Sequence, residues 1–493
     1  MSAREHWPTA LHRAAGARDI DRLAIAAGTP GIELMERAGA YAFSVLRERW
    51  PSARRITAVC GTGNNGGDGF VLARLALEAG CEATIALVGD ADDIRGDARL
   101  ALERLACVGV RVQSFDRDGL AGADVVIDAL LGIGLKRPLD GDYASAVSVL
   151  NSQPAPVLAM DVPTGLNADT GAVMGACVQC AATVTFVALK QGLLTGRAPA
   201  FTGRLYFADL GIAPAIAAQV VRSARWMGAA ALVERLLPRA RDAHKGDFGH
   251  VVVVGGAEGY AGAALMSARA AARAGAGLVS LVTHETHAAM VVMACPEVMV
   301  HGAGAPPQLG RFLDRATVLA AGPGLGQEAW GRKLFESVCR APKPIVLDAD
   351  GLNWLARLGG HRDDWILTPH PAEAGRLLGV STATVQEDRF AVARAIAERF
   401  GGVCVLKGPG TVVDNGTDTV VVTTGNPGMA SGGSGDVLTG VIAALLGQGL
   451  AAFDAATIGA CWHGYAGDLA AADGERGMLA TDVIEHLRRA GNP

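Results

Sequence analysis

The sequence predicts an α/β protein of two domains, each built on an open, largely parallel sheet with helices packed on it. Its 493 residues exceed what one ordinary hydrophobic core accommodates, so the length indicates two domains. Half of the residues are hydrophobic, 19% are charged and 65 are glycine, a composition typical of closely packed helices and strands. In both halves short apolar runs alternate with helix-like segments, which is the pattern of parallel sheets.

The N-terminal half has the pattern of a doubly wound parallel sheet. Residues 19–46 carry apolar side chains at helical spacing, and we expect this segment to pack over the sheet. The Gly-rich sequence GTGNNGGDG at 61–69 follows the first strand, and a helix is expected to begin near Phe70. The expected strands are residues 55–60, 83–88, 123–129, 157–161 and 182–188.

A domain junction is expected near residue 225. Residues 211–245 contain Pro214 and Pro238 and lack clear alternation, which is typical of a connection between domains. The resulting domains are 1–224 and 225–493, and no internal repeat relates them. The strands expected in the second domain are residues 250–255, 278–283, 316–321, 344–348, 365–368, 404–407 and 419–423.

Charge and cysteine content narrow the class of protein. A net charge of −5 leaves no basic stripe for a phosphate backbone, so we expect no nucleic-acid partner. Nine scattered cysteines fit reduced thiols in the cytosol, and the Cys177/Cys180 pair lacks the further ligands of a metal site. An apolar signal core and a run of about 20 apolar residues are both missing, so we expect a cytoplasmic protein without a membrane partner.

The Gly-rich turn at 61–69 predicts a ligand site. Glycines permit the sharp turn, and backbone N–H groups at a helix start can seat a pyrophosphate or similar anion. Gly61, Gly63 and Gly66 satisfy the dinucleotide fingerprint, but Asp68 beside the anion and the missing ribose-binding acid argue against a dehydrogenase. Asn64, Asn65 and Asp68 are instead predicted oxygen donors for a ligand or a hard cation.

Two further strand ends supply acids to the same edge. Asp128 in VIDALLGIGLKRP and Asp161 in AMDVPTGLNADTG each lie at the carboxyl end of a predicted strand, which is where open α/β sheets bind ligands. Asn65, Asp128 and Thr164 offer neutral and singly charged oxygens, a set that suits a weakly hydrated K⁺ ion.

These motifs, together with LMERAG at 34–39, closely resemble the NAD(P)H-hydrate epimerase domain, over residues 10–215. The resemblance implies a Rossmann-like fold and reversible interconversion of the R and S epimers at the hydrated nicotinamide carbon. It implies that Asp161 binds the substrate and transfers the proton, and that Asn65, Asp128 and Thr164 hold K⁺. The implied substrate contacts are Asn64, Asn65, Gly66, Gly67, Asp68, Gly132, Ile133, Gly134, Leu135, Lys136, Arg137, Pro138 and Asp161.

The C-terminal half contains TGNPGMASGGSGD at 424–436, followed by an apolar helix expected over 437–446. A Gly-rich turn at a helix N-terminus presents N–H donors to a phosphoryl group, and the helix dipole adds to the attraction. Asp436 is placed where a general base could take the proton from an attacking hydroxyl. The sequence therefore predicts phosphoryl transfer to an alcohol. Other predicted strand ends at this edge carry residues 322–326 and 407–411, the acids Asp348, Asp350 and Glu373, and His370.

This half resembles the ribokinase-like superfamily and, within it, the NAD(P)H-hydrate dehydratases. The resemblance rests on HKGDFGHVVVVGGAEGYAGAA, RAGAGLV, AGPGLG, DADGLN, TPHPAEAGRLLG, KGPGT and NPGMASGGSGDVLTG, spread over residues 244–450. It implies that ADP or ATP phosphorylates the ring hydroxyl of the S hydrate, that Mg²⁺ bridges the phosphates, and that phosphate then leaves to regenerate NADH or NADPH. The implied hydrate contacts are Ala263, Gly324, His370 and Asp436, and the implied nucleotide contacts are Lys407, Gly408, Pro409, Gly410, Thr411 and Gly435.

The two resemblances together predict a bifunctional repair enzyme in which an epimerase supplies the epimer that a dehydratase accepts. The expected partners are hydrated NADH and NADPH and an adenine nucleotide, and a homo-oligomer is expected. Two other interpretations stay open at this point. The C-terminal half could be a vitamin-precursor kinase of ribokinase type, and the N-terminal half could be a catalytically silent binding module. The choice between ADP and ATP also stays open.

Overall fold

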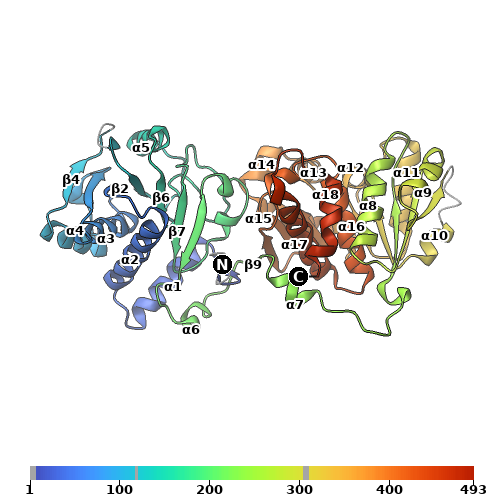
Figure 1. Ribbon diagram of the computed structural model, residues 1–493, viewed down its shortest axis with the longest axis horizontal. Helices are drawn as coiled ribbons and strands as arrows, with labels where there is room; N and C mark the ends of the chain where they lie inside the picture. Colours follow the sequence, from blue (N-terminus) through green and yellow to red (C-terminus); the bar gives the residue numbers. More distant parts are fainter. Residues whose placement is uncertain (1–6, 117–119, 304–309, 493) are drawn as a thin grey trace. The chain divides into compact units, whose positions relative to one another are not determined.

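The structure is a computed structural model that describes residues 7–116, 120–303 and 310–492. Its chain divides into two compact units, Met1–Arg225 and Trp226–Pro493, called unit 1 and unit 2 below. Each unit is a sheet covered by helices (Figure 1), which confirms the predicted α/β class.

Unit 1 contains a parallel sheet with strand order β4-β3-β2-β5-β6-β7-β8. From β2 the chain first builds outward through β3 and β4 and then returns to add β5 on the other side of β2. The carboxyl ends of β2 and β5 therefore flank a topological switch point, which is where open α/β sheets bind ligands. The strands are β2 (Arg55–Cys60), β3 (Glu82–Leu87), β4 (Arg111–Ser114), β5 (Val125–Ala129), β6 (Val157–Met160), β7 (Ala182–Phe186) and β8 (Arg204–Ala208).

Helices cover both faces of this sheet. Apolar residues of the first four helices form one buried cluster with the sheet, and those of α5 form a second cluster on the opposite face. The expected helical segment 19–46 is two helices, because Gly28 has a φ of 108° and Pro30 cannot continue a helix. The helices are α1 (Ala14–Ala26), α2 (Gly31–Arg49), α3 (Asn64–Glu78), α4 (Gly96–Cys107), α5 (Gly141–Ser152) and α6 (Pro214–Ala217), and two short strands are β1 (Ala10–Leu11) and β9 (Ala224–Met227).

Helix α3 begins at Asn64, six residues before the start expected from the sequence. Two glycines in its first turn are buried because the turn packs closely on its surroundings. A side chain at Gly66 would overlap the carbonyl oxygen of Gly61, and one at Gly67 would lie 2.6 Å from the sulfur of Met35. The glycines that were expected to form a loop therefore let a helix start directly at the end of β2.

Unit 2 contains a sheet with the order β18-β17-β16-β15-β14-β13-β10-β11-β12. Pairing is parallel from β12 to β16 and antiparallel for β17 and β18. Strands β12 and β17 were not expected from the sequence. The strands are β10 (His250–Val254), β11 (Leu278–Thr283), β12 (Met299–Gly302), β13 (Val318–Ala321), β14 (Ile345–Leu347), β15 (Trp365–Leu367), β16 (Val403–Leu406), β17 (Thr411–Asp414) and β18 (Thr419–Val422).

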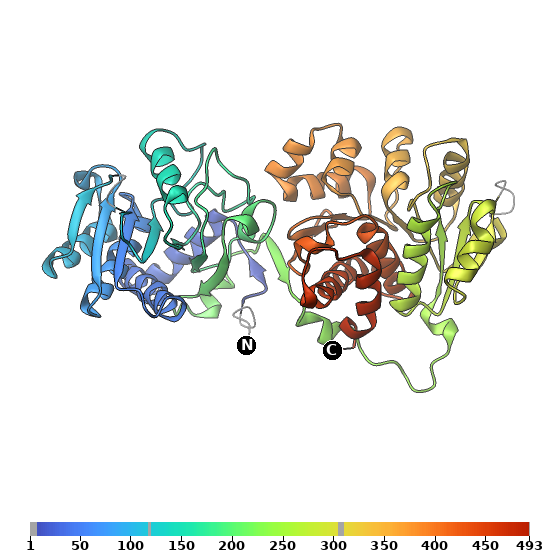
Figure 2. The ribbon, with the colours of Figure 1, turned by 45° about the horizontal axis from the view of Figure 1, so that its top comes forward.

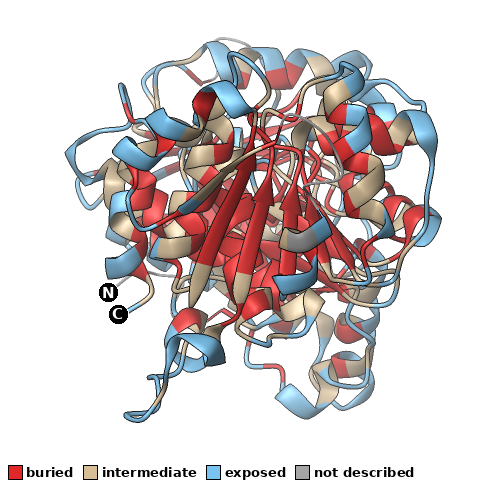
Figure 3. Ribbon diagram, turned by 90° about the vertical axis from the view of Figure 1, so that its right-hand side faces the viewer, coloured by how far each residue is buried: buried red, intermediate tan, exposed pale blue. Residues whose placement is uncertain are grey.

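The strands of unit 2 are buried between helices, as Figure 3 shows. Helix α16 lies beside α8, α17 and α18 (Figure 2). It begins at Ser434 rather than at Val437, so the end of the Gly-rich motif is its first turn. The helices are α7 (Ala231–Arg235), α8 (Ala261–Arg273), α9 (Ala288–Ala294), α10 (Gly310–Arg315), α11 (Ala329–Arg340), α12 (Ala349–Leu358), α13 (Pro371–Leu378), α14 (Thr382–Glu387), α15 (Arg389–Phe400), α16 (Ser434–Gly447), α17 (Ala452–Ala470) and α18 (Ala480–Ala490).

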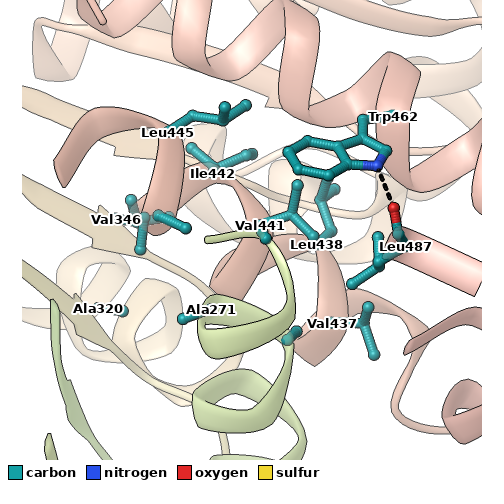
Figure 4. Close-up of a cluster of buried hydrophobic side chains, with 14 of the residues drawn as sticks. Ala271, Ala320, Val346, Val437, Leu438, Val441, Ile442, Leu445, Trp462 and Leu487 are labelled. Atoms are coloured by element: carbon teal, nitrogen blue, oxygen red, sulfur yellow. Dashed lines mark hydrogen bonds between the residues drawn. The ribbon is translucent and has the colours of Figure 1, made fainter. Parts of the chain in front are cut away.

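Apolar side chains of α16 form the centre of the unit 2 core (Figure 4). Val441 and Ile442 are fully buried, and the ring of Trp462 from α17 donates a hydrogen bond of 2.8 Å to the carbonyl oxygen of Leu487. A side chain at Gly440 would overlap the backbone of α8, so the two helices approach closely at this point. This packing positions the N-terminus of α16, on which the site described below depends.

We expect Ile442→Ala to destabilise unit 2. Its side chain is fully buried, and removing such a side chain costs about 2–5 kcal/mol because it leaves a cavity. Chemical denaturation followed by circular dichroism measures the effect. As a control, Met293→Ala removes a side chain that is 86% exposed and should change the free energy of unfolding by less than about 0.5 kcal/mol. Equal effects of the two substitutions would contradict the packing described here.

Candidate functional site

A cavity of about 380 Å³ lies at the switch point of unit 1. It is bounded by the start of α3, by the segment after β5 and by the segment after β6, and residues of α1 and α2 complete its wall. The structure thus brings together side chains from three predicted strand ends. The predicted site residues that line the cavity are Asn64, Asn65, Asp68, Gly132, Ile133, Gly134 and Asp161.

Other predicted residues of unit 1 lie elsewhere. Gly66 and Gly67 are buried within the packing of α3 and serve its close approach to β2 and α2. Leu135, Lys136, Arg137 and Pro138 are not among the described residues that line the cavity. Their contact with a substrate therefore stays a prediction.

Asp161 is held in an unusual conformation at the end of β6. Its φ is +63°, in the left-handed region that non-glycine residues rarely adopt. Its Oδ1 accepts hydrogen bonds from the Lys190 ammonium group, from the Thr185 hydroxyl (3.1 Å) and from the Phe186 amide (3.3 Å). Its Oδ2 lies on the side of Gly132, 3.2 Å from the position that a β-carbon there would take. One carboxylate oxygen is thus saturated with donors and the other faces the cavity wall.

Lys190 was not identified from the sequence, although it lines the cavity. Its side chain is 2% exposed and forms an ion pair with Asp161. The only indication in the sequence was a single cation within the apolar segment 183–194. Such residues are seldom buried without a partner, and the partner lies 29 residues away.

A second carboxyl group of the cavity has a strongly perturbed pKa. Burial raises the pKa of Asp68 well above its ordinary value, and the nearby carboxylates of Asp161 and Asp21 raise it further, while Lys190 opposes them. Asp68 therefore favours its protonated form more than an exposed carboxyl group does, whereas Asp161 is ion-paired. A cavity with one carboxyl of each kind is suited to proton transfer.

Asp128, Thr164 and Asn65 form a candidate cation site. Asp128 is fully buried and accepts hydrogen bonds from the Thr164 amide (2.8 Å) and the Thr164 hydroxyl (2.7 Å). Burial raises its pKa to about 6, although the bonds from Thr164 oppose the shift. The side-chain oxygen and nitrogen of Asn65 are buried without a hydrogen-bond partner. An unpartnered amide oxygen is the kind of ligand that suits a hard, weakly hydrated cation.

In unit 2 an ion pair lies where β14 and β16 end. Nζ of Lys407 lies 2.6 Å from Oδ1 of Asp348 and 3.9 Å from Oε2 of Glu373. Oδ2 of Asp348 accepts a hydrogen bond of 2.8 Å from the Thr439 hydroxyl of α16. Burial opposes ionisation of Asp348, but Lys407 and Thr439 outweigh it and lower its pKa. Lys407, predicted to contact a nucleotide, thus has carboxylate partners within the protein.

Asp436 lies in the first turn of α16, close to this ion pair. Burial raises its pKa to about 7, and the acids Asp348 and Glu373 raise it further, while Lys407 lowers it. Its carbonyl oxygen accepts a hydrogen bond of 2.5 Å from Ser267 of α8, which fixes the start of α16. A carboxyl group with such a pKa can act as a general base near neutral pH.

The start of α16 also has the geometry of an anion site. Its N-cap, Gly433, has a φ of 94°, and the backbone N–H groups of the following residues are free of helix partners by position. Ala263 lies in the first turn of the neighbouring helix α8. A β-carbon at Gly324 would lie 3.3 Å from that of Ala263, so these two predicted hydrate contacts are neighbours.

The predicted nucleotide segment, residues 407–411, follows β16 and ends at the first residue of β17. The guanidinium group of Arg389 is buried beneath it and donates to the carbonyl oxygens of Leu406 (3.0 Å) and Lys407 (3.1 Å). The Thr411 hydroxyl donates to the Gly408 carbonyl at 3.1 Å. A β-carbon at Gly435 would lie 3.1 Å from Nζ of Lys407, so this predicted nucleotide contact adjoins the segment. The segment is completed by Pro409 and Gly410.

His370 has a structural role that the sequence interpretation did not assign. Its Nδ1 accepts hydrogen bonds from the amides of Ala372 (3.1 Å) and Glu373 (3.4 Å), and the Glu373 carboxylate accepts one from the His370 amide. His370 therefore caps α13. Burial lowers its pKa, with a further contribution from Lys407, so the ring is neutral. The side chain is still 47% exposed, and a ligand contact stays a prediction.

Cys177 and Cys180 are buried, and their thiols form no disulfide. Among residues 7–116, 120–303 and 310–492, no group of three or more His, Cys, Asp and Glu side chains has the arrangement of a metal centre. Within the same residues, no helix combines the length and apolar character that a membrane span needs.

The two units and their sites define a class of protein: an enzyme with two active sites, one an acidic cavity on a doubly wound sheet and the other a phosphoryl-transfer site on a ribokinase-like sheet. Family comparisons give the same division. A family described as YjeF-related protein N-terminus matches residues 31–192, and a family described as NAD(P)H-hydrate dehydratase matches residues 251–489.

Relatives match over nearly the whole chain. The bifunctional NAD(P)H-hydrate repair enzyme Nnr of Coxiella burnetii is 45% identical over 98% of this chain and 100% of its own length. The enzyme of the same name from Escherichia coli is 45% identical over 94% of this chain and 90% of its own. A solved ribokinase-like superfamily protein from Enterococcus faecalis V583 is 27% identical, with a TM-score of 0.51, over 54% of this chain and 95% of its own.

The chain belongs to the family of bifunctional NAD(P)H-hydrate repair enzymes. The prediction of an enzyme with an epimerase domain and a dehydratase domain is thereby confirmed. Neither a vitamin-precursor kinase nor a silent N-terminal module accounts for this match over both units.

Proposed function

We propose that this protein repairs hydrated NADH and NADPH. Residues 1–224 interconvert the R and S epimers, and residues 225–493 dehydrate the S epimer with ADP or ATP, yielding AMP or ADP and phosphate. The observation that carries the proposal is Asp436, a carboxyl of pKa about 7 in the first turn of a Gly-capped helix. The resemblance also supports a cytoplasmic location and a homo-oligomeric state, and sedimentation of the purified protein tests the oligomeric state.

In the dehydratase, Asp436 accepts the proton of the ring hydroxyl as that oxygen attacks the terminal phosphorus of the nucleotide. The amides at the start of α16 and the segment 407–411 hold the transferred phosphoryl group and its donor. Phosphate then leaves with the push of the ring nitrogen lone pair, because phosphate is a far better leaving group than hydroxide. Loss of a neighbouring ring proton completes the reduced nicotinamide.

The carboxylate of Glu373 is near this start of α16 and is the kind of oxygen ligand that Mg²⁺ prefers. Bound Mg²⁺ would neutralise charge on the nucleotide phosphates. Lys407 keeps the adjacent Asp348 ionised. The positive charge of its ammonium group offsets that carboxylate, which limits the net negative charge of the site before the nucleotide binds.

The pKa of Asp436 predicts how the dehydration rate depends on pH. A general base works only when deprotonated, so kcat/KM should rise with pH through about 7 and fall tenfold per unit below it. We expect this limb in profiles measured with pure S hydrate, ADP and Mg²⁺. Asp436→Asn should abolish the limb along with most of the rate. A profile that falls as pH rises through neutrality would contradict the assignment.

In the epimerase, water leaves the carbon beside the ring nitrogen and returns to its other face. The nitrogen lone pair stabilises the flat cation formed in between. Asp161 receives the proton of the returning water and, in the reverse direction, supplies it to the departing hydroxyl. The amide oxygen of Asn65, with Asp128 and Thr164, would hold K⁺ beside the cavity. The bound ion would supply a positive charge there.

Removal of K⁺ is expected to slow epimer exchange. Asn65 contributes an oxygen with no other partner, so Asn65→Ala should raise the K⁺ concentration needed for half-maximal exchange by roughly tenfold or more. The measurement is the exchange rate in buffers whose K⁺ is replaced by a bulky organic cation. Dehydration of pure S hydrate in the same samples serves as the control. Exchange rates that ignore K⁺ in the wild type would exclude the cation site.

The whole proposal is tested by one assay. Purified protein is incubated with mixed R and S hydrates, with and without ADP and Mg²⁺, while the absorbance of reduced nicotinamide is followed. We expect reduced nicotinamide to form only with nucleotide and to account for both epimers. A stable phosphorylated alcohol in its place would indicate a kinase, and no consumption of either epimer would refute the proposal.

A further inference from the structure

Lys190 is a buried lysine at the wall of the unit 1 cavity. Its side chain is 2% exposed. A buried ammonium group without partners is strongly destabilising, because it loses its hydration and nothing replaces it. A charged lysine at this position therefore requires that the surrounding groups compensate it.

Three acceptors surround the ammonium group. Nζ of Lys190 donates to Oδ1 of Asp161, to the Thr185 hydroxyl at 3.1 Å and to the Phe186 carbonyl at 2.6 Å. An ammonium group has three N–H donors, so this set uses all of them. Lys190 thus has no donor left for a substrate, and any role in the reaction is exerted through Asp161.

The same contacts determine how Asp161 faces the cavity. Oδ1 accepts hydrogen bonds from Lys190, the Thr185 hydroxyl and the Phe186 amide, whereas Oδ2 lies toward Gly132. The residue keeps a φ of +63°, a conformation that persists where surrounding contacts enforce it. The ion pair is one of those contacts, because it ties the carboxylate to the strand end at β7.

Acidic groups from other elements also face this pair. Asp68 of α3 and Asp21 of α1 both interact with the charges of the cavity, and His12, which follows β1, lies near Lys190. Neighbouring carboxylates favour protonation of one another, since like charges repel. Lys190 offsets the negative charge of these carboxyl groups.

We propose that Lys190 is a positioning residue of the epimerase: by binding Oδ1 it holds Asp161 with Oδ2 toward the hydrate. The inference rests on the proposed function of unit 1. In the step concerned, the oxygen of water bonds to the ring carbon, the ring C=N π pair returns to nitrogen, and one water proton passes to Oδ2. The reverse step returns that proton to the departing hydroxyl, so no further reactant is needed.

The test compares Lys190→Met and Lys190→Arg with the wild type in full-length protein. Lys190→Met removes the ammonium group that holds Oδ1, so its kcat for exchange should fall by roughly tenfold or more with KM nearly unchanged. Lys190→Arg keeps a charged donor at this position and should restore most of kcat.

An unchanged kcat in Lys190→Met, or a change in KM alone, would overturn the inference. Should Lys190→Met fail to fold, Thr185→Val decides, because it removes a neutral hydrogen bond to the same Oδ1. That variant must lower kcat without raising KM, and an unchanged kcat overturns the inference. Absence of exchange in the wild type would instead refute the proposed function of unit 1.

Discussion

Asp436→Ala is expected to lower the nucleotide-dependent formation of NADH or NADPH by about 10²–10⁴-fold, the range over which a positioned general base contributes. The substitution removes the carboxyl whose pKa lies near 7 and leaves the Gly-capped start of α16 in place. Nucleotide should therefore still bind, so the loss should appear in kcat more than in KM. Epimer exchange should stay at the wild-type rate, because its proposed residues all belong to unit 1.

The assay uses pure S hydrate with ADP and Mg²⁺, and thermal melting checks that the variant is folded. Asp363→Ala is a matched control, since it removes a carboxylate of unit 2 that is 95% exposed. We expect the control to retain full activity. Loss of both activities in folded Asp436→Ala protein would contradict two separate sites.

Asp161→Asn should slow epimer exchange by a similar factor, about 10²–10⁴-fold. Asparagine keeps the shape of the side chain and tolerates the left-handed conformation, but it cannot accept a proton at neutral pH. Exchange is measured by NMR or by chiral chromatography of the separated epimers. With a mixture of hydrates, ADP and Mg²⁺, the variant should convert the S epimer and leave the R epimer.

The same substitution leaves Lys190 without its carboxylate partner, so some loss of stability accompanies it. Dehydration of pure S hydrate by the variant is the control for an intact unit 2. Epimer exchange at the wild-type rate in Asp161→Asn would refute the role proposed for this residue.

The positions of the central strands were the part of the fold that the sequence predicted best. Strands 55–60 and 278–283 were expected with the bounds that β2 and β11 have. Helix starts were placed too late, because the glycines before Phe70 and Val437 were interpreted as loops. In the structure Gly66, Gly67 and Gly435 lie within helical first turns packed closely against neighbouring groups, and only the three-dimensional packing makes glycine favourable there.

The edge strands β4, β8 and β12 and the inner strand β17 were missed for a related reason. β4 and β12 are short and partly exposed and lack the continuous apolar run of a central parallel strand. β17 pairs antiparallel within the second sheet, directly after a turn rich in glycine and proline. Their assignment depends on a neighbouring strand that the local pattern does not reveal.

By itself, the sequence determined the class of fold, the family, the strand ends that carry Asp128 and Asp161, and the Gly-rich segment that carries Asp436, because periodicity and glycine placement are local properties of the chain. The tertiary structure alone decided which charges meet. Lys190 pairs with Asp161 across 29 residues, and Asp348 meets Lys407 across 59. The electrostatic balance of both sites depends on these partners. Coulomb and desolvation energies follow distance and burial, which sequence separation does not specify.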